Sequence, residues 1–252
     1  MFLGDNFLLG GINRFVDEFD SSAMDAQILL TKVAEPQFFG VAVLDEGGNI
    51  VQLLEKPKDP PSDLAVVGVY LFGKQIHEAV RSITPSARGE LEITEAIEWL
   101  IRSGRTVRSY MVDGYWKDTG RLEDMLECNR RVLELVDTRI DGTVDAASSI
   151  TGRVVIEEGA VIERSTVRGP AVIGRDTRIV DSYVGPFTSI YYGCTVDGSE
   201  VEHSIVLENC TIRAVGRIQD SLIGKNVEVT RVVDLPKAHR LMVGDHSQVR
   251  LS

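Results

Sequence analysis

The second half of the chain repeats with a period of 17 residues, and this period constrains the fold more than any other feature. One series of aliphatic residues with this step comprises Ile150, Val167, Val184, Val201 and Ile218. Two further series lie between its members: Ile156, Ile173, Ile190 and Leu207, and Ile162, Ile179 and Val196. An aliphatic residue at every fifth or sixth position is the hexapeptide signature of a parallel β-helix. We therefore predict coils of three short strands over residues 150–234, with a left-handed winding that departs from the usual right-handed crossover.

Serine residues mark one predicted corner of this β-helix. Ser165, Ser182 and Ser199 keep the 17-residue step, and Ser204 and Ser221 resume it after an offset of five residues. We interpret the offset as an insertion in one coil.

Residues 1–136 follow a different pattern. Strand-like runs occupy residues 26–33, 39–45, 49–56 and 64–72, and helix-like runs occupy residues 74–83, 90–104 and 121–136. Strands mixed with helices indicate an α/β layer structure, which we expect to contain a parallel sheet. The change of pattern predicts an α/β domain over 1–136, the β-helix over 137–234 and a tail over 235–252.

The composition excludes some classes of partner. The 252 residues carry a formal net charge of −11, which disfavours general binding to nucleic acid or to an anionic membrane. We expect no signal peptide and no membrane span, since the chain has no apolar run of the necessary length. The cysteines Cys128, Cys194 and Cys210 match no zinc-binding spacing, so we expect a protein of the reducing cytoplasm.

Two aspartates are candidates for a cation site, and the first lies where a strand is expected to end, a common place for such a site in α/β proteins. Asp5 follows the apolar run at 1–3, and Asp118 lies in YWKDTGR (115–121), just before a predicted helix. In one interpretation, Asp118 or Thr119 caps that helix. In the other, Asp118 is a second carboxylate that meets Asp5 across a cleft. The local spacing favours the capping interpretation.

Other charged residues at element ends are candidates for binding a phosphorylated sugar. Glu55 and Lys56 adjoin where Pro57 ends a strand, and Arg88 precedes a predicted helix. Such residues are most often solvated. In a binding site, Glu55 would accept hydrogen bonds from sugar hydroxyls, while Lys56 and Arg88 would meet an anion. We expect structural or surface roles for all four histidines: His77, His203, His239 and His246.

Five segments of the chain, in the same order, resemble the sugar nucleotidyltransferase family: FLGDN (2–6), FFGVAVLDEGGNIVQLLEKP (38–57), VVGVYLF (66–72), SARGELEIT (86–94) and YWKDTGR (115–121). The hexapeptide repeat and the tail LPKAHRLMVGDHSQV (235–249) resemble the long form of this family that acts on glucose 1-phosphate. The resemblance implies an α/β Rossmann-like nucleotidyltransferase core, here partial, plus an all-β left-handed parallel β-helix. It also implies nucleotidyl transfer from dTTP to a sugar 1-phosphate, with release of pyrophosphate, in deoxysugar nucleotide biosynthesis.

The family's site residues carry over to the matching positions of this chain. Asp5 and Asp118 resemble the two aspartates that hold Mg²⁺ against the triphosphate. By resemblance, the substrate-binding positions are Asn6, Gly40, Glu55, Lys56, Val66, Tyr70 and Arg88. Phe39 stands where the family often has Tyr, so one hydroxyl contact is in doubt. The implied partners are a sugar 1-phosphate, dTTP and further copies of the chain in a homo-oligomer.

The glycine-rich loop GGxGTRLxPxT, which holds the nucleotide in this family, does not occur in these residues. We therefore expect the chain to correspond to the sugar-phosphate half of the core plus the β-helix, without roughly the first hundred residues of the family, and to be inactive alone. Two alternatives stay open. The chain is a non-catalytic assembly or regulatory subunit, or it is a hexapeptide acyltransferase that uses His203, in which case it would turn over an acyl-CoA.

Overall fold

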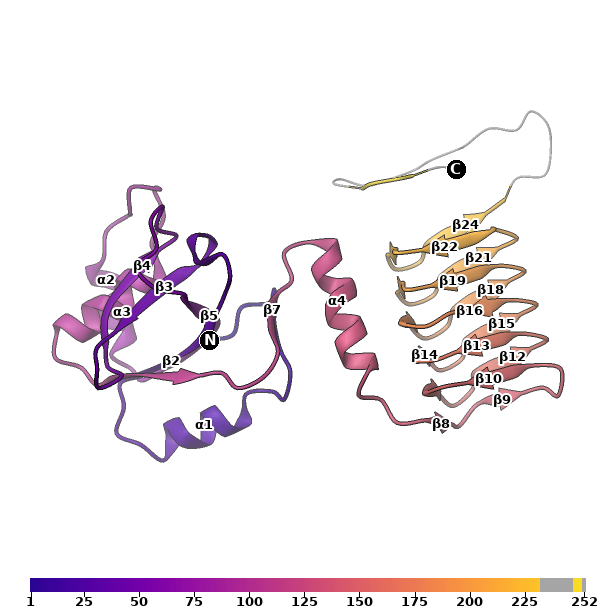
Figure 1. Ribbon diagram of the computed structural model, residues 1–252, viewed down its shortest axis with the longest axis horizontal. Coiled ribbons are helices and arrows are strands. Elements are labelled where there is room, and N and C mark those ends of the chain that lie inside the picture. The colour runs from indigo at the N-terminus through magenta and orange to yellow at the C-terminus, as the bar shows by residue number, and fades with distance from the viewer. Residues whose placement is uncertain (232–246, 251–252) are drawn as a thin grey trace. The chain divides into compact units, whose positions relative to one another are not determined.

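The computed structural model describes residues 1–231 and 247–250 and divides the chain into two compact units, Met1–Cys128 and Asn129–Ser252 (Figure 1). His239, His246 and most of the predicted tail lie outside the described residues. Among the helices of the described residues, none is long and apolar enough to cross a membrane.

A five-stranded sheet forms the centre of the first unit. Its order is β4-β3-β5-β2-β6, with the bounds β2 Ala26–Lys32, β3 Gly40–Leu44, β4 Ile50–Glu55, β5 Leu64–Phe72 and β6 Val107–Met111. The four predicted strands are confirmed, but the expectation of a parallel sheet is wrong, because only β2 and β6 pair in parallel. The physical reason is a tight turn between β3 and β4, where the Asp45 carboxylate accepts hydrogen bonds from the backbone N–H groups of Gly47 and Asn49. This turn reverses the chain at once, so β4 returns antiparallel to β3.

Helices cover both faces of this sheet, with the bounds α1 Asn13–Asp20, α2 Ile76–Ser82 and α3 Ile93–Arg102, and a short 3-10 turn η1 spans Pro36–Phe38. On one face, Ile97 of α3 packs against Ile28 and Leu30 of β2. On the other face, Phe15 of α1 packs against Leu29. Because successive strand residues point to opposite faces, one run of β2 supplies both cores. Helix α1 was not predicted, since its eight residues are mostly polar or charged.

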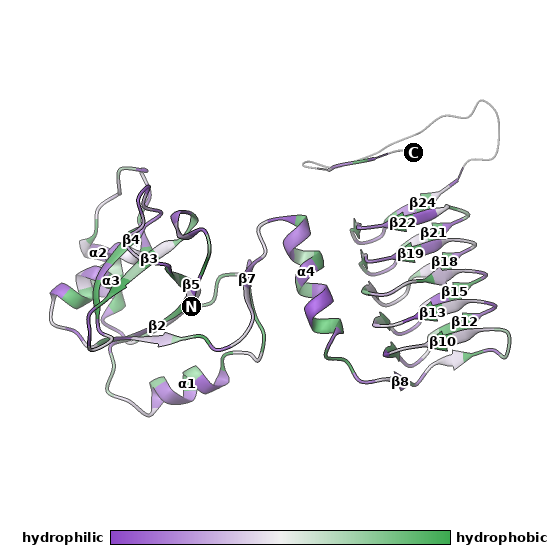
Figure 2. Cartoon of the chain, in the orientation of Figure 1, coloured by the Kyte–Doolittle hydropathy of each residue, from purple (hydrophilic) through white to green (hydrophobic). Residues whose placement is uncertain are grey.

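Two short strands far apart in the sequence form a second sheet in this unit. β1 (Asn6–Leu8) pairs antiparallel with β7 (Trp116–Asp118), so that Asn6 lies opposite Asp118. Helix α4 (Leu122–Leu133) follows β7, and its ribbon alternates between hydrophilic and hydrophobic residues (Figure 2). Lys117 of β7 forms ion pairs with Asp124 and Glu127 of α4, both at 3.0 Å. These contacts fix β7, and therefore Asp118, against the start of the helix.

The second unit is the predicted parallel β-helix, built from three sheets. One sheet contains β10 Ser149–Thr151, β13 Thr166–Arg168, β16 Tyr183–Val184, β19 Glu200–Glu202 and β22 Arg217–Gln219. The next contains β8 Arg139–Ile140, β11 Val154–Ile156, β14 Ala171–Ile173, β17 Thr188–Ile190, β20 Ile205–Val206 and β23 Leu222–Ile223. The third contains β9 Thr143–Val144, β12 Val161–Glu163, β15 Arg178–Val180, β18 Thr195–Asp197, β21 Thr211–Arg213 and β24 Glu228–Thr230. Every pairing between these strands is parallel.

Equivalent aliphatic residues stack inside the β-helix as the period predicts, with one exception. Ile162, Ile179 and Val196 are in register and fully buried. In the second series, however, Val206 rather than Leu207 pairs with Ile190 and fills the core. The two residues are adjacent and both aliphatic, so the period alone did not separate them.

The predicted insertion is also wrong. Ser182 N–H donates to Ser165 Oγ at 3.0 Å, and Ser199 N–H donates to Ser182 Oγ at 3.1 Å, so these three serines stack at one corner. Ser204 lies at the next corner, between β19 and β20, where its Oγ accepts from Ser221 N–H. The serines therefore form two separate ladders. The offset between Ser199 and Ser204 is a change of corner.

The last part of α4 belongs to the β-helix unit. Asn129 Nδ2 donates to the Phe187 carbonyl at 3.1 Å, and Asn129 Oδ1 accepts from Ser189 Oγ at 2.6 Å. Arg130 lies over the Phe187 ring, with 5.9 Å from Cζ to the centroid. Because of these contacts, the two units divide between Cys128 and Asn129, earlier than the predicted boundary at 136.

Candidate active site

The β1–β7 pairing brings Asp5 and Asp118 together from opposite ends of the first unit. Asn6 lies opposite Asp118, and both the N–H and the Oγ1 of Thr119 donate to the Asp5 carbonyl, at 2.7 and 2.8 Å. Asp118 Oδ1 accepts from Gly120 N–H at 3.1 Å, a bond that closes a turn ahead of α4, which begins at Leu122. Neither helix capping nor cation binding by Asp118 follows from this bond, and both stay predictions.

The charges at this position suit a cation. Burial raises the pKa of Asp118, and the neighbouring Asp5 carboxylate raises it further. Two carboxylates held this close repel each other unless a positive charge lies near them. Within the described residues, no group of three or more His, Cys, Asp and Glu side chains forms a metal site. Mg²⁺ prefers oxygen ligands and usually keeps several waters, so a pair of carboxylates could hold it only together with phosphate and water.

Lys56 is a positive charge that acts on Asp118. It has φ of 41°, an uncommon value for a residue other than glycine, and its N–H donates to the Phe39 carbonyl at 3.0 Å. Its ammonium lowers the pKa of both Glu55 and Asp118. Lys56 is exposed, so its ammonium is accessible to an anion that binds near Glu55 and Asp118.

Glu55 is the centre of a hydrogen-bonded network on the sheet. Thr94 Oγ1 donates to Glu55 Oε2 at 3.1 Å, and Arg88 Nη1 lies 3.6 Å from Glu55 Oε1. Burial is the main cause that raises the pKa of Glu55. Arg88 also forms ion pairs with Glu90 and Glu92, at 3.2 and 3.4 Å. An incoming phosphate would therefore compete with carboxylates for Arg88. Thr94 was missed, although it ends the segment SARGELEIT.

Gly40 and Tyr70 complete the wall around Glu55. A Cβ at Gly40 would lie 2.9 Å from Thr94 Cγ2, 3.3 Å from Glu55 Oε2 and 3.6 Å from Val66 Cβ, so only glycine fits there. Burial raises the pKa of Tyr70 to about 12, with smaller contributions from Glu55 and Asp5. The Tyr70 hydroxyl therefore feels the charges of Glu55 and Asp5.

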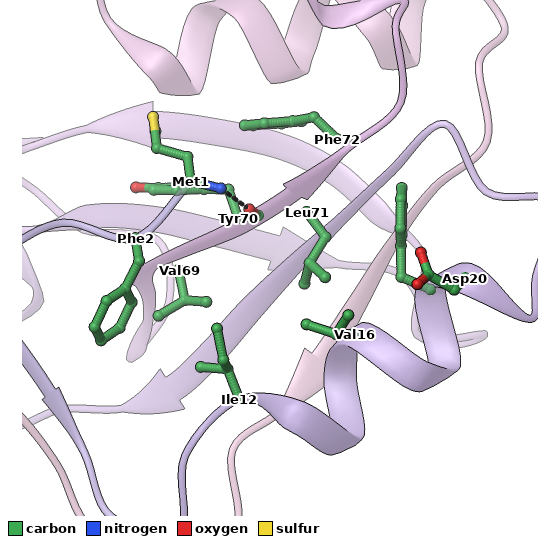
Figure 3. Close-up of a pocket in the computed structure, with 10 residues that line it drawn as sticks. Met1, Phe2, Ile12, Val16, Asp20, Val69, Tyr70, Leu71 and Phe72 are labelled. Carbon is green, nitrogen blue, oxygen red and sulfur yellow. Dashed lines mark hydrogen bonds between the residues drawn. The ribbon is translucent and has the colours of Figure 1, made fainter.

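A hollow of about 300 Å³ beside β5 lies away from this chemistry. Its lining is mostly apolar and includes Met1, Phe2, Ile12 and Val16 (Figure 3). Of the predicted site residues it contains only Tyr70, whose carbonyl accepts a hydrogen bond from the Met1 ammonium at 2.7 Å. We assign no sugar-phosphate chemistry to it, because its lining includes the Asp20 carboxylate, which would repel a phosphate, and no Lys or Arg side chain.

His203 has an acidic partner in the β-helix unit. Its Nδ1 lies 2.5 Å from Asp220 Oδ1, and its ring stands at 90° to Phe187. Asp220 lies on the neighbouring coil, 17 residues after His203 in the sequence. A hollow in the same unit, lined by Arg164, Tyr183 and Glu200 among others, does not include His203.

The fold and the family matches define a nucleotide-transferring enzyme. Residues 1–134 match the family model described as nucleotidyl transferase, and residues 174–248 match the model described as GlmU-like, C-terminal hexapeptide. The chain belongs to the nucleotidyl transferase family, which confirms the resemblance found in the sequence.

Close relatives carry a particular enzyme name. The glucose-1-phosphate thymidylyltransferase of Streptomyces griseus is 55% identical over 252 residues, which are 100% of this chain and 71% of that protein. The enzyme of the same name from Streptomyces antibioticus is 54% identical with the same coverage. The low-salt glycan biosynthesis nucleotidyltransferase of Haloferax volcanii is 43% identical over 254 residues, again 100% and 71% of the two chains.

Proposed function

We propose that the chain supplies the sugar-phosphate site and the metal-binding aspartates for thymidylyl transfer from dTTP to glucose 1-phosphate, a step in deoxysugar nucleotide biosynthesis. The observation that carries this proposal is the convergence of Asp5 and Asp118 beside Lys56 and the Glu55 network. The relatives named glucose-1-phosphate thymidylyltransferase support the choice of sugar and nucleotide.

In this reaction, an oxygen of the sugar phosphate forms a bond to the α-phosphorus of dTTP. The bond from that phosphorus to the oxygen bridging the α- and β-phosphates breaks, and pyrophosphate leaves with the bonding electrons. Lys56 and Arg88 neutralise the sugar phosphate, and Glu55 accepts hydrogen bonds from the sugar hydroxyls. Gly40 lets the sugar approach the backbone. Bound Mg²⁺, held by Asp5 and Asp118, would supply charge neutralisation at the triphosphate.

The setting of the reaction is part of the proposal. The three cysteines of the described residues are free and buried, as in a protein of the reducing cytoplasm. The net charge of −11 disfavours nucleic acid and anionic membranes as partners. A homo-oligomer stays a prediction from the family resemblance.

The substitution Gly40→Ala is expected to weaken binding of glucose 1-phosphate about tenfold, because an added Cβ displaces Thr94 and Glu55. Isothermal titration calorimetry measures the affinity. Gly216→Ala is the matched control, since a Cβ at Gly216 meets no atom within 4 Å. Equal affinities for the two variants would show that Gly40 does not line the sugar site.

The substitution Asp118→Asn is expected to raise the thermal unfolding midpoint at pH 7 without Mg²⁺ and to abolish any further rise with Mg²⁺. The pKa of Asp118 is raised in the folded state, so its ionisation opposes folding: stability is full below the unfolded pKa and is lost as the pH rises through the folded pKa. The asparagine variant escapes this loss, and its advantage should disappear below about pH 4. A variant that is less stable than the parent at pH 7 would contradict the proposed repulsion.

The function itself is tested with an extended version, in which a family segment carrying GGxGTRLxPxT precedes Met1. This protein is incubated with Mg²⁺, glucose 1-phosphate and each nucleoside triphosphate in turn, and pyrophosphate is measured. We expect release with dTTP that Asp118→Asn abolishes. Release unaffected by Asp118→Asn would favour a non-catalytic role for this chain. Turnover of acetyl-CoA that His203→Ala abolishes would favour the acyltransferase alternative.

A further inference from the structure

Asn6 lies between the aspartate pair and the central sheet, and both ends of its side-chain amide are engaged within the protein. Its Oδ1 accepts from Trp116 Nε1–H at 2.7 Å and from Gly68 N–H at 3.0 Å. Its Nδ2 donates to Asp5 Oδ1 at 3.0 Å. A side chain held in this way has little capacity left for a substrate, which argues against the substrate-binding role that the family resemblance implied.

The fit between Asn6 and Gly68 is close. A Cβ at Gly68 would lie 2.5 Å from Asn6 Nδ2 and 2.7 Å from Asn6 Cγ, so the amide lies directly against the backbone of β5. Glycine inside a strand weakens the sheet unless another group must approach closely. Here that group is the amide of Asn6.

The two hydrogen bonds to Oδ1 also determine which end of the amide faces Asp5. Trp116 and Gly68 both present N–H donors, so the amide oxygen must face them and the NH₂ group must face Asp5. A flipped amide would lose both bonds. Meanwhile the backbone of Asn6 pairs with Asp118. One residue is therefore tied to both members of the aspartate pair, to Asp5 by its side chain and to Asp118 by its main chain.

We infer that Asn6 is a positioning residue, whose amide holds the Asp5 carboxylate toward Asp118 so that the two aspartates share one divalent cation. This inference rests on the proposed function. Outer-shell hydrogen bonds to a metal-ligating carboxylate typically contribute about 10–100-fold in metal affinity or activity. No local sequence pattern indicates this role, because Gly68 and Trp116 lie far from Asn6 along the chain.

Two substitutions test the inference from different sides. Asn6→Asp keeps the shape of the side chain but replaces the donor to Asp5 with a carboxylate oxygen. Gly68→Ala leaves Asn6 and Asp5 chemically unchanged and displaces the amide through the added Cβ. The matched control is Asn49→Asp: Asn49 Nδ2 also donates to an aspartate, Asp45, at 3.1 Å, but in the β3–β4 turn. Thermal unfolding shows which variants fold.

The first readout is binding of Mn²⁺, followed by electron paramagnetic resonance, to the extended version and its variants in the presence of dTTP. The second is the separation of kcat from KM for glucose 1-phosphate. For Asn6→Asp and Gly68→Ala we expect Mn²⁺ affinity and kcat to fall about 10–100-fold, with KM changed less than about threefold. Asn49→Asp should leave both readouts at the level of the parent protein.

The inference is overturned if Mn²⁺ affinity and kcat stay unchanged in the folded Asn6→Asp variant, or if only KM rises, since Asn6 would then contact the sugar directly. Equal losses in Asn49→Asp would also overturn it, because the effect would follow from any Asn→Asp change beside an aspartate. Failure of the proposed function is a separate outcome: the parent would release no pyrophosphate, while its Mn²⁺ binding would still depend on Asn6.

Discussion

A polypeptide of residues 1–252 alone should release pyrophosphate from dTTP and glucose 1-phosphate at least about a thousandfold more slowly than the extended version, since single preorganised donors already contribute about 10²–10³-fold. In the proposed site, Lys56 and Arg88 would meet a sugar phosphate and the two aspartates would meet a cation. The site presents no glycine-rich loop to the triphosphate, because the motif does not occur in these residues. Alignment of the two substrates therefore depends on groups outside this set.

The measurement is pyrophosphate release by both proteins under the same conditions, with glucose 1-phosphate binding as a control for folding. We expect the short polypeptide to retain weak binding, because Lys56 and Arg88 remain. Equal turnover by the two proteins would mean that the nucleotide site lies within these 252 residues, and would refute the division of roles proposed for this chain.

The substitution Ile179→Ala is expected to destabilise the β-helix unit by about 2–5 kcal/mol, the usual cost of removing a buried Ile side chain to Ala. Ile179 is fully buried and stacks between Ile162 and Val196 in neighbouring coils. Each coil is stabilised mainly by its neighbours, so a cavity in the middle weakens the interfaces on both sides.

Urea unfolding followed by circular dichroism measures the change. Val180→Ala is the matched control, because Val180 adjoins Ile179 on β15 but points outward and is only half-buried. We expect a loss below about 1 kcal/mol for the control. A similar loss for both variants would show that the inward stack does not determine the stability of this unit.

The sequence predicted the β-helix well because its period is a property of one continuous segment. Each inward residue repeats every 17 positions, and the strand pairings reproduce that step for Ile162, Ile179 and Val196. The prediction was wrong at Leu207, where Val206 fills the core one position earlier. The step from Val201 to Val206 is five residues, whereas the equivalent step from Val184 to Ile190 is six. Val206 and Leu207 are both aliphatic, so the hydrophobic pattern does not show which of them points inward when a step shortens by one residue.

The site was predicted as a set of residues by family resemblance, but its internal geometry was not. The pairing of β1 with β7 joins three residues near the start of the chain to three beyond residue 115. A repeating sequence pattern cannot predict a contact between segments so far apart. For the same reason the contacts of Thr94 and Asn6 could be seen only in the structure. Both depend on hydrogen bonds between residues far apart in sequence, Thr94 to Glu55 and Asn6 to Gly68 and Trp116.

The most direct test of the account is the effect of Mn²⁺ on the ³¹P resonance of glucose 1-phosphate bound to this chain. If Asp5 and Asp118 hold the cation beside the sugar phosphate, Mn²⁺ should broaden the resonance strongly in the parent chain. Asp118→Asn should remove that broadening while glucose 1-phosphate still binds. Broadening of equal size in the parent and in Asp118→Asn, or none in either while the sugar phosphate is bound, would contradict the placement of the metal and the sugar phosphate in one site.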